Sequence, residues 1–426
     1  MRTLSVSPDG RSLCFDGEPV PLVMDTAWSA FAKATEDEWR LYLAARRRQG
    51  FNAVLVTAVE VPHDRMERSG GREPFALDAE GHHDYARPDM SYFETARRYM
   101  AIAHHEYDIR VLLVVLWNDF VPGTWGAAAV PHAVMPPGAR ATYLRLVIDM
   151  FGDLEPVFVV GGDDLYDVPE ANEVYIEAAD LLRAACPRSV LTTHTAPRAV
   201  LPDAIAQRLD LYLHQTGHNL ECQELPWTQP EDYLRRVPRK PLINSEPPYE
   251  LHGIVGGHGR WRREDVRRAI WASILSGAAA GIGYGAHGIW MWATTSGSFT
   301  AAATSLPPSS WAETLMLPGA LDVSLMGYLM RQHGMHRVDP AQELLEPIAD
   351  PAFRLAADPD RDIVALYLPY PLAVSIRLDL EGYRITAWDL HERAPLVVDT
   401  TTEGAVTRFG QLFSASDQLV IAERTV

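Results

Sequence analysis

Two carboxyl-bearing residues, far apart in the sequence, each stand at the end of a short apolar run. Asp163 follows the run 157–160 and a pair of glycines, and Glu246 follows a run that starts at Leu242. Two carboxyl groups that face each other can share the work of acid, base and nucleophile in a hydrolysis. Cleavage of a glycosidic bond requires such a pair beside the bond, so the pattern predicts a hydrolase that acts on a sugar.

Polar and aromatic side chains stand at the ends of most other apolar runs as well. Amide, imidazole and carboxylate groups can hydrogen-bond sugar hydroxyls, and tryptophan presents a flat face to the apolar side of a sugar ring. The residues predicted to bind substrate are Asp25, Trp28, Trp117, Asn118, His194, Gln215, His218, Asn244, Tyr249, His287 and Trp290. Any one of them alone is more often a helix cap, an ion-pair partner or a core residue, so the prediction rests on their joint pattern.

The immediate neighbours of the two carboxylates also fit a crowded site. Gly161 and Gly162 would let backbone and sugar approach closely beside Asp163, because glycine carries no Cβ. Asn244 lies two residues before Glu246, so on a regular strand both side chains point to the same side. We therefore expect Asn244 to hydrogen-bond the sugar or the Glu246 carboxylate.

Eight short apolar runs, which alternate with longer amphipathic segments, must position these residues. The runs cover residues 22–24, 53–56, 111–116, 157–160, 190–191, 211–213, 242–243 and 283–292. The helix-like segments cover residues 36–49, 92–107, 140–151, 171–185, 203–208, 230–237 and 263–277. This alternation indicates a parallel sheet covered on both faces, and eight units predict a (β/α)8 TIM barrel of the α/β class. The active site of such a barrel lies at the carboxyl ends of its strands, where the residues named above fall.

Both ends of the chain are typical of β structure. Asp-Gly turns at residues 9–10 and 16–17 predict a hairpin that leads into the first barrel strand. From about residue 348, short β-prone runs separated by polar turns predict a small C-terminal antiparallel β domain. We expect a catalytic barrel with its N-terminal hairpin at residues 1–345 and a β-sandwich-like domain at residues 346–426.

The composition narrows the class of partner and the compartment. The 426 residues carry a net charge of −18, which argues against nucleic acid and anionic membranes as partners. A neutral carbohydrate or small glycoside is the expected substrate, and its hydrolysis needs no cofactor and no metal. The three cysteines are widely spaced and imply no disulfide framework. The N-terminus has no signal-peptide pattern and no apolar run is long enough to span a membrane, so we expect a cytoplasmic protein.

Seven short motifs follow one another in the order and spacing of a known family. They are Asp25-Thr26-Ala27-Trp28, Gly50-Phe51-Asn52, Leu116-Trp117, Gly161-Gly162-Asp163, Gln215-Thr216-Gly217-His218, Asn244-Ser245-Glu246-Pro247-Pro248-Tyr249-Glu250 and Tyr284-Gly285-Ala286-His287-Gly288-Ile289-Trp290. Over about residues 12–300 the chain resembles the apiosidase-like glycoside hydrolases, the group around glycoside hydrolase family 140. The resemblance implies a (β/α) barrel, a C-terminal β domain and removal of terminal β-linked apiose by a retaining mechanism. It also implies that Asp163 is the acid/base and Glu246 the nucleophile.

The chain departs from the family pattern beside both carboxylates. Ser245 stands where glycine is usual and Thr216 where serine is usual. Asp164 follows the acid, and a double proline at 247–248 follows the nucleophile. Apiose, arabinofuranose and another terminal pentose or hexose therefore stay open as the released sugar.

The same residues admit other classes of protein. A metal-dependent hydrolase or deacetylase on the same barrel would use Asp25, His194, His218 and His287, but no His-x-His or His-Glu-x-x-His spacing occurs at a strand end. A carbohydrate-binding protein without activity would keep the cleft but would not need the carboxylate pair. A doubly wound open sheet would normally carry a glycine-rich phosphate turn after its first strand, and residues 25–28 contain no glycine.

Overall fold

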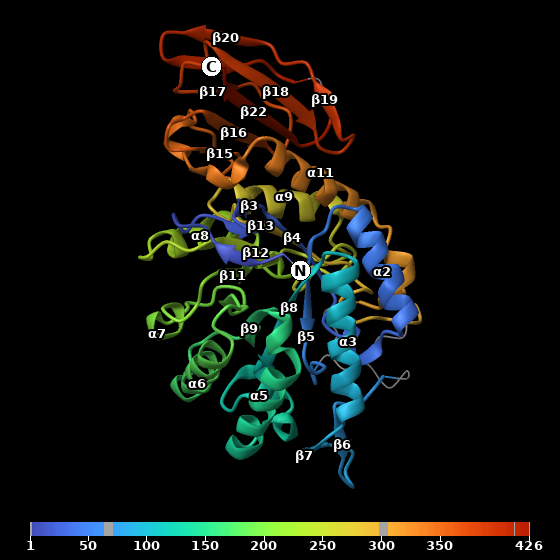
Figure 1. The fold of residues 1–426 in the computed structure, drawn as a ribbon. Helices are drawn as coiled ribbons and strands as arrows, with labels where there is room; N and C mark the ends of the chain where they lie inside the picture. Colours follow the sequence, from blue (N-terminus) through green and yellow to red (C-terminus); the bar gives the residue numbers. More distant parts are fainter. Residues whose placement is uncertain (1, 64–70, 298–305, 413, 426) are drawn as a thin grey trace.

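The structure is a computed structural model that describes residues 2–63, 71–297, 306–412 and 414–425, and parallel strands form its centre (Figure 1). In chain order they are β4 (Leu22–Thr26), β5 (Ala53–Thr57), β8 (Arg110–Trp117), β9 (Val157–Gly162), β10 (Leu191–Thr192), β11 (Tyr212–Gln215), β12 (Leu242–Glu246) and β13 (Gly281–Tyr284). Pairing runs from β13 through β4, β5, β8 and β9 to β10, and β11 pairs with β12. A bridge between His194 and Leu213 and a 3.2 Å hydrogen bond from the Ala280 N–H to the Leu242 carbonyl join the two groups. The predicted (β/α)8 barrel is confirmed.

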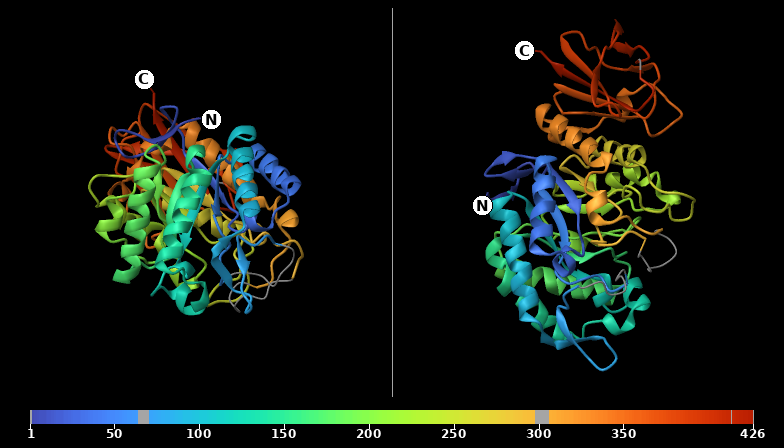
Figure 2. Two further views of the ribbon diagram at one scale, coloured as in Figure 1. Left: turned by 60° about the horizontal axis from the view of Figure 1, so that its bottom comes forward. Right: turned by 90° about the vertical axis from the view of Figure 1, so that its right-hand side faces the viewer.

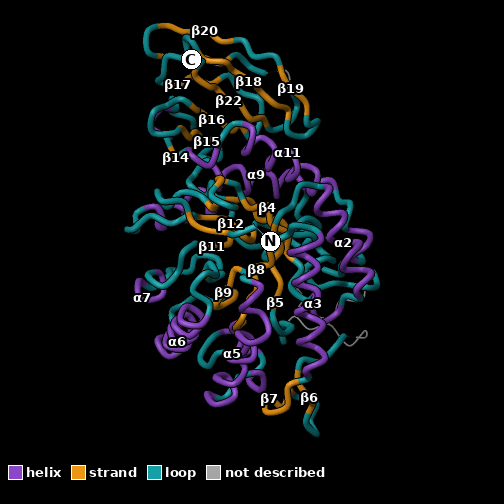
Figure 3. Tube along the Cα trace, viewed as in Figure 1, coloured by secondary structure: helices purple, strands orange, loops and turns teal. Residues whose placement is uncertain are grey.

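Helices surround this ring of strands (Figure 3). The longer ones are α2 (Glu36–Arg48), α3 (Met90–Glu106), α5 (Pro137–Phe151), α6 (Pro169–Ala185), α8 (Leu225–Leu234), α9 (Arg263–Ile274) and α11 (Pro318–Gln332). The shorter ones are α1 (Ala30–Lys33), α4 (Trp125–Ala129), α7 (Asp203–Ala206) and α10 (Trp311–Thr314). Within the described ranges, no helix combines the length and the apolar character needed to cross a membrane.

Two of the longer helices differ from the prediction. Instead of covering residues 230–237, α8 begins at Leu225 because Pro226 occupies its first turn, where proline's missing N–H leaves no hydrogen bond unmade. Pro230 then lies inside the helix. The sequence pattern did not predict α11, which begins with Pro318 at its amino end.

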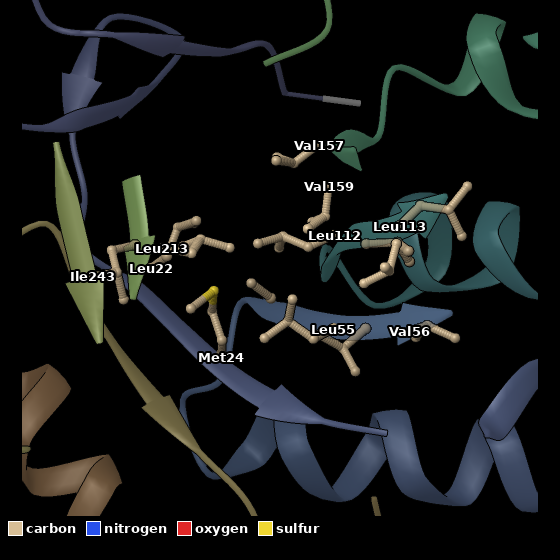
Figure 4. Close-up of a cluster of buried hydrophobic side chains, with 14 of the residues drawn as sticks. Leu22, Met24, Leu55, Val56, Leu112, Leu113, Val157, Val159, Leu213 and Ile243 are labelled. Atoms are coloured by element: carbon tan, nitrogen blue, oxygen red, sulfur yellow. The ribbon is translucent and has the colours of Figure 1, made fainter. Parts of the chain in front are cut away.

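The barrel interior is filled with aliphatic side chains from six strands (Figure 4). Leu22, Met24, Leu55, Leu112, Val159, Leu213 and Ile243 are all buried. Burying each such side chain stabilises the fold by roughly 1.5–3 kcal/mol. This packing sets the strand positions, and therefore sets which residues meet at the carboxyl ends.

The last barrel strand is shorter than its apolar sequence run suggests. The run 283–292 predicts one long strand, but β13 ends at Tyr284. Beyond it the chain turns, with Gly288 at a φ of +137°, a conformation that favours glycine. The Ala293 N–H donates to the Gly288 carbonyl at 2.8 Å and closes the turn. His287 and Trp290 therefore lie in a loop and not on a strand.

Antiparallel sheets form both ends of the chain. At the N-terminus are β1 (Leu4–Val6), β2 (Leu13–Phe15) and β3 (Glu18–Pro19), and β6 (Phe75–Leu77) and β7 (His83–Pro88) form a separate hairpin. The first C-terminal sheet contains, in spatial order, β14 (Asp339–Pro340), β15 (Arg354–Ala357), β16 (Ile363–Leu368), β22 (Gln418–Arg424), β18 (Tyr383–Asp389) and β19 (Ala394–Leu396). The second contains β17 (Val374–Ile376), β21 (Val406–Phe409) and β20 (Thr400–Glu403). The antiparallel C-terminal region is confirmed, whereas the division of the chain at residue 345 stays a prediction.

The C-terminal sheets stand at one side of the barrel, next to its outer helices α9 and α11 (Figure 2). A buried ion network joins the two parts. Arg267 of α9 bonds Asp322 of α11 at 2.7 Å, and its Nε bonds Asp417, beside β22, at 2.8 Å. The Tyr367 hydroxyl of β16 donates to Asp417 at 3.1 Å. Because a buried charge without its partner is strongly destabilising, this network holds the sheets against the barrel.

Candidate active site

A cleft of about 460 Å³ opens at the carboxyl ends of the barrel strands. That volume lies within the ~300–1,000 Å³ that is typical of small-molecule sites. The described residues that line it are Trp28, Trp117, Trp125, Asp163, Pro197, Gln215, Gly217, His218, Asn219, Glu246, Tyr249, His252, Val255 and Trp290. Both predicted carboxylates and six of the predicted binding residues belong to this set. A smaller hollow beside His82 and His132, of about 70 Å³, contains none of the predicted residues.

Glu246 ends β12 at the floor of the cleft and is only 8% exposed. Each carboxylate oxygen faces an imidazole: Oε2 lies 3.1 Å from Nε2 of His194, and Oε1 lies 3.0 Å from Nε2 of His218. Burial by itself would raise the pKa of Glu246, but the contacts with His194 and His218 outweigh burial and hold that pKa well below its usual range. The cleft therefore contains a carboxylate that stays ionised although it is shielded from water.

Each of these histidines is fixed from its other ring nitrogen. The Tyr249 N–H donates to Nδ1 of His218 at 3.3 Å, so the ring proton of neutral His218 is on Nε2, facing Glu246. Nδ1 of His194 lies 2.9 Å from the Ser245 hydroxyl, which itself lies 3.1 Å from the His214 carbonyl. These outer contacts orient the two rings towards the carboxylate.

Asp163 directly follows β9 and is half-buried in the lining of the cleft. Its backbone is left-handed, with a φ of +51°, which costs a non-glycine residue roughly 1–2 kcal/mol. Its N–H donates to the His194 carbonyl at 3.0 Å, and its own carbonyl accepts the Trp125 Nε1–H at 2.8 Å and a bond from Asn118. The Gln215 side chain donates to its Oδ1. These contacts hold the backbone of Asp163 in its left-handed conformation and keep the carboxyl group in one position.

The two glycines before Asp163 make room for aromatic rings. A Cβ on Gly161 would lie 2.6 Å from the Tyr175 ring, and a Cβ on Gly162 would lie 2.4 Å from the Trp117 ring. Both distances are too short for any larger residue. The expected close approach at these glycines is therefore made by protein side chains, Trp117 above all.

Four aromatic side chains surround the space beside Glu246, and each is at most 6% exposed. The Trp28 and Trp117 rings meet edge to face, with centroids 5.1 Å apart. The Trp28 Nε1–H donates to the Tyr249 hydroxyl at 3.1 Å, and the Tyr249 and Trp290 rings lie 6.4 Å apart. Such a rigid apolar wall suits the C–H faces of a single sugar ring.

Two predicted sugar contacts are corrected by the structure. Asp25 is fully buried outside the cleft, where it forms an ion pair with Arg46 at 2.6 Å and accepts a 2.8 Å bond from the Tyr42 hydroxyl, both on α2. Asn244 does not share a side with Glu246, because the pairing of β11 with β12 shifts by one residue at Ser245. Such a bulge breaks the two-residue alternation of side chains.

Asn244 and the remaining predicted residues lie behind the cleft surface. Asn244 donates to the Ser273 hydroxyl at 3.0 Å, and Asn118 donates to the Asp163 carbonyl. His194 is fully buried behind Glu246. Nε2 of the buried His287 lies 2.7 Å from the Leu306 carbonyl, and its Nδ1 accepts the Trp290 Nε1–H at 3.1 Å. These side chains position the lining, and the structure does not place them where they touch a ligand in the cleft.

Six lining residues were not predicted from the sequence, and two of them carry aromatic rings, Trp125 on α4 and His252. The His252 ring stacks on His218 with centroids 4.0 Å apart. Its Nδ1 lies 2.7 Å from the Gly253 carbonyl, and burial lowers its pKa well below the usual range, so the ring is neutral. Both residues lie beyond the strand ends, where strand periodicity gives no signal. An isolated tryptophan seven residues after Asn118 was the available hint.

The residues named for the metal-dependent alternative do not converge. Asp25 pairs with Arg46, His194 and His218 face Glu246, and His287 bonds the Leu306 carbonyl. In the part of the chain that the structure describes, no group of three or more histidine, cysteine or acidic side chains is arranged to hold a metal ion.

The barrel and the carboxylate-bearing cleft define the class of protein, and the class is glycoside hydrolase. The chain belongs to the apiosidase-like family, because the model of the family's catalytic domain matches residues 7–337. A search of curated proteins finds no match.

Solved structures show the same fold. A glycoside hydrolase matches with a TM-score of 0.78 at 17% identity, over 99% of this chain and 97% of that one. A family 5 glycoside hydrolase from Bacteroides vulgatus matches with a TM-score of 0.80 at 18% identity, over 99% and 94%. A family 5 mannosidase from Rhizomucor miehei is more distant, with a TM-score of 0.54 at 10% identity, over 78% and 98%.

Proposed function

We propose that this chain is a retaining exo-glycosidase that releases a terminal β-linked sugar, apiose or a related pentose, from a small plant-derived glycoside or oligosaccharide. Glu246 is the nucleophile and Asp163 the general acid/base. The observation that carries the proposal is the buried Glu246 carboxylate, kept ionised by His194 and His218.

The low pKa of Glu246 favours retention over inversion. In an inverting enzyme the second carboxylate must take a proton from water, and a general base works best when its pKa lies near the working pH. The histidines hold the Glu246 pKa well below its usual range, so this carboxylate is a weak base. A nucleophile needs only to be ionised, and a stable carboxylate is also a good leaving group in the second step.

The reaction follows from the two carboxyl groups. Glu246 attacks the anomeric carbon while protonated Asp163 gives its proton to the glycosidic oxygen, so that the leaving group departs as an alcohol and a glycosyl ester forms. Asp163 then takes a proton from water, and the water oxygen displaces Glu246 from the anomeric carbon. Two inversions give net retention and restore both carboxyl groups. Gln215 donates a hydrogen bond to Oδ1 of Asp163 and so helps to orient the carboxyl group that transfers the proton.

The choice of sugar rests on the family and on the lining. The described lining contains no lysine or arginine, which favours a neutral sugar over a uronic acid. The four inner aromatic residues belong to the lining of the cleft, and their rings suit the C–H groups of a pentose. An arabinofuranosidase is the second candidate, since its substrate presents the same ring size and charge.

A panel of aryl β-glycosides tests the proposal. We expect hydrolysis of the β-apiofuranoside, and proton NMR of the first turnovers should show the β anomer before mutarotation. Release of the α anomer would contradict the retaining mechanism. Faster hydrolysis of the arabinofuranoside would correct the sugar while leaving the mechanism in place.

A further inference from the structure

One tryptophan of the cleft differs from all the others. The chain has eleven tryptophans, all among the described residues, and only Trp125 is exposed, at 39%. Contact of a large apolar ring with water is unfavourable. An exposed ring in a cleft is therefore a surface available to a ligand.

The Trp125 ring is held in place although it is exposed. Its Nε1–H donates to the Asp163 carbonyl at 2.8 Å, and the His63 ring packs edge-on against it at 4.7 Å. At the start of α4, the Thr124 side chain caps the helix by accepting from the Ala127 N–H. The next residue, Gly126, lies so close to Asn118 that a Cβ there would be 2.1 Å from Oδ1 of Asn118. The ring is a fixed platform and not a swinging side chain.

The platform stands beside the acid/base and apart from the inner aromatic wall. Trp28, Trp117, Tyr249 and Trp290 contact one another around Glu246, whereas the Trp125 ring packs against His63. In the proposed reaction the sugar sits over Glu246 and the leaving group sits against Asp163, which protonates its oxygen.

We propose that Trp125 forms the leaving-group subsite and stacks on a neutral aromatic aglycone. The described lining adds apolar Pro197 and Val255 and no lysine or arginine, which disfavours a phosphorylated or carboxylated leaving group. Stacking on a fixed ring gains affinity at little entropic cost, because the ring is already ordered. This inference rests on the proposed function, since it takes the leaving group to lie on the Asp163 side.

Two leaving groups on one sugar separate stacking from an indirect effect on Asp163. The probes are 4-nitrophenyl β-D-apiofuranoside and methyl β-D-apiofuranoside, assayed with the full-length protein. If Trp125 stacks on the aglycone, Trp125→Ala lowers kcat/KM roughly fivefold to tenfold for the nitrophenyl glycoside and little for the methyl glycoside. If Trp125 only positions Asp163, the methyl glycoside loses more, because its poor leaving group depends on the proton.

A conservative variant and a distant control complete the test. Trp125→Phe keeps a flat ring but cannot bond the Asp163 carbonyl, so it should retain most of the nitrophenyl preference. Tyr328→Ala removes an exposed aromatic ring from α11, outside the cleft, and should leave kcat/KM for both glycosides unchanged. Equal losses on both probes in Trp125→Ala, or a larger loss on the methyl glycoside, would overturn the inference. Absence of turnover of any glycoside by the unmodified protein would instead refute the proposed function, and the subsite with it.

Discussion

Glu246 and Glu250 lie four residues apart, and both are buried, yet their environments shift their pKa values in opposite directions. Glu246 faces His194 and His218, which overcome the effect of burial and lower its pKa. Glu250 accepts neutral hydrogen bonds from the Tyr284 hydroxyl at 2.6 Å and from the Gly319 N–H at 3.0 Å. Burial outweighs those bonds and raises the pKa of Glu250 to about 7.

The difference shows that burial raises the pKa of a carboxyl group unless its partners outweigh that effect, as the two imidazoles do at Glu246. Glu246 is kept as an anion at the floor of the cleft, as a nucleophile requires. Glu250 is a structural group at the amino end of α11, and it does not line the cleft. Changing each group, or the partners of Glu246, tests this contrast.

The largest effect is expected from Glu246→Gln. The amide cannot form a glycosyl ester, so kcat/KM should fall by roughly 10⁴-fold or more while the fold is kept. Glu250→Gln is the matched control, with the same chemical change four residues away, and should keep activity within about threefold. Comparable activity losses in both variants, measured on the same aryl glycoside, would refute the assigned roles.

Replacing Asp163 by alanine should have the next largest effect. Loss of the acid/base should lower kcat/KM by roughly 10²–10⁴-fold, and less for aryl leaving groups, which depart without a proton. Azide needs no base to attack the glycosyl ester, so adding it should restore turnover and yield a β-glycosyl azide. An α-glycosyl azide, or no rescue with a nitrophenyl glycoside, would contradict the role of Asp163.

Removing one histidine should raise the pKa of Glu246 towards the raised pKa of Glu250. Without the contact at 3.0 Å from His218, burial dominates more and the pKa of Glu246 rises. Because Glu246 must be ionised to react, the acid limb of the kcat/KM profile in His218→Ala should move to higher pH. Activity at neutral pH should fall roughly 10–100-fold. An acid limb that stays in place would show that His218 does not set the charge of Glu246.

A smaller shift in the same direction is expected for Ser245→Ala. Ser245 contacts Nδ1 of His194 at 2.9 Å and so orients the ring whose Nε2 faces Glu246. Loss of one neutral hydrogen bond should lower kcat/KM about twofold to tenfold. It should shift the acid limb of the kcat/KM profile to higher pH by less than His218→Ala does. A change in thermal stability with no change in the pH profile would mean that Ser245 only stabilises the structure of the bulge.

The smallest expected effect is on stability and concerns Glu250. Its pKa is raised from 4.5 to about 7 in the folded protein, so folding favours the protonated form. The stability that this proton supplies is present below the unfolded pKa and is lost as the pH rises through about 7. Glu250→Gln should therefore stabilise the protein by roughly 1–3 kcal/mol at pH values about one unit above 7 and by little near pH 4. Calorimetry at both pH values measures this, and an equal gain at both would contradict it.

The sequence predicted the site best for residues at the ends of the barrel strands. Asp163, Gln215 and Glu246 stand directly at or after strand ends, so their convergence followed from the barrel alone. The prediction for Asn244 was wrong because the bulge at Ser245 changes the direction in which its side chain points. Apolar periodicity in the sequence does not reveal such a bulge. Trp125 and His252 were missed because the positions of residues outside the strands depend on packing between segments distant in sequence.

The sequence by itself determined the barrel, the two carboxyl groups and their family, because apolar periodicity and the order of short motifs are local properties. The tertiary structure alone decided which carboxylate is held ionised. That outcome depends on His194 and His218, which lie 52 and 28 positions from Glu246 and reach it only through the strand order β10, β11 and β12. It also assigned Asp25 to a buried ion pair and Trp125 to the cleft. Charge and exposure are set by neighbours in space, and the fold alone brings those neighbours together.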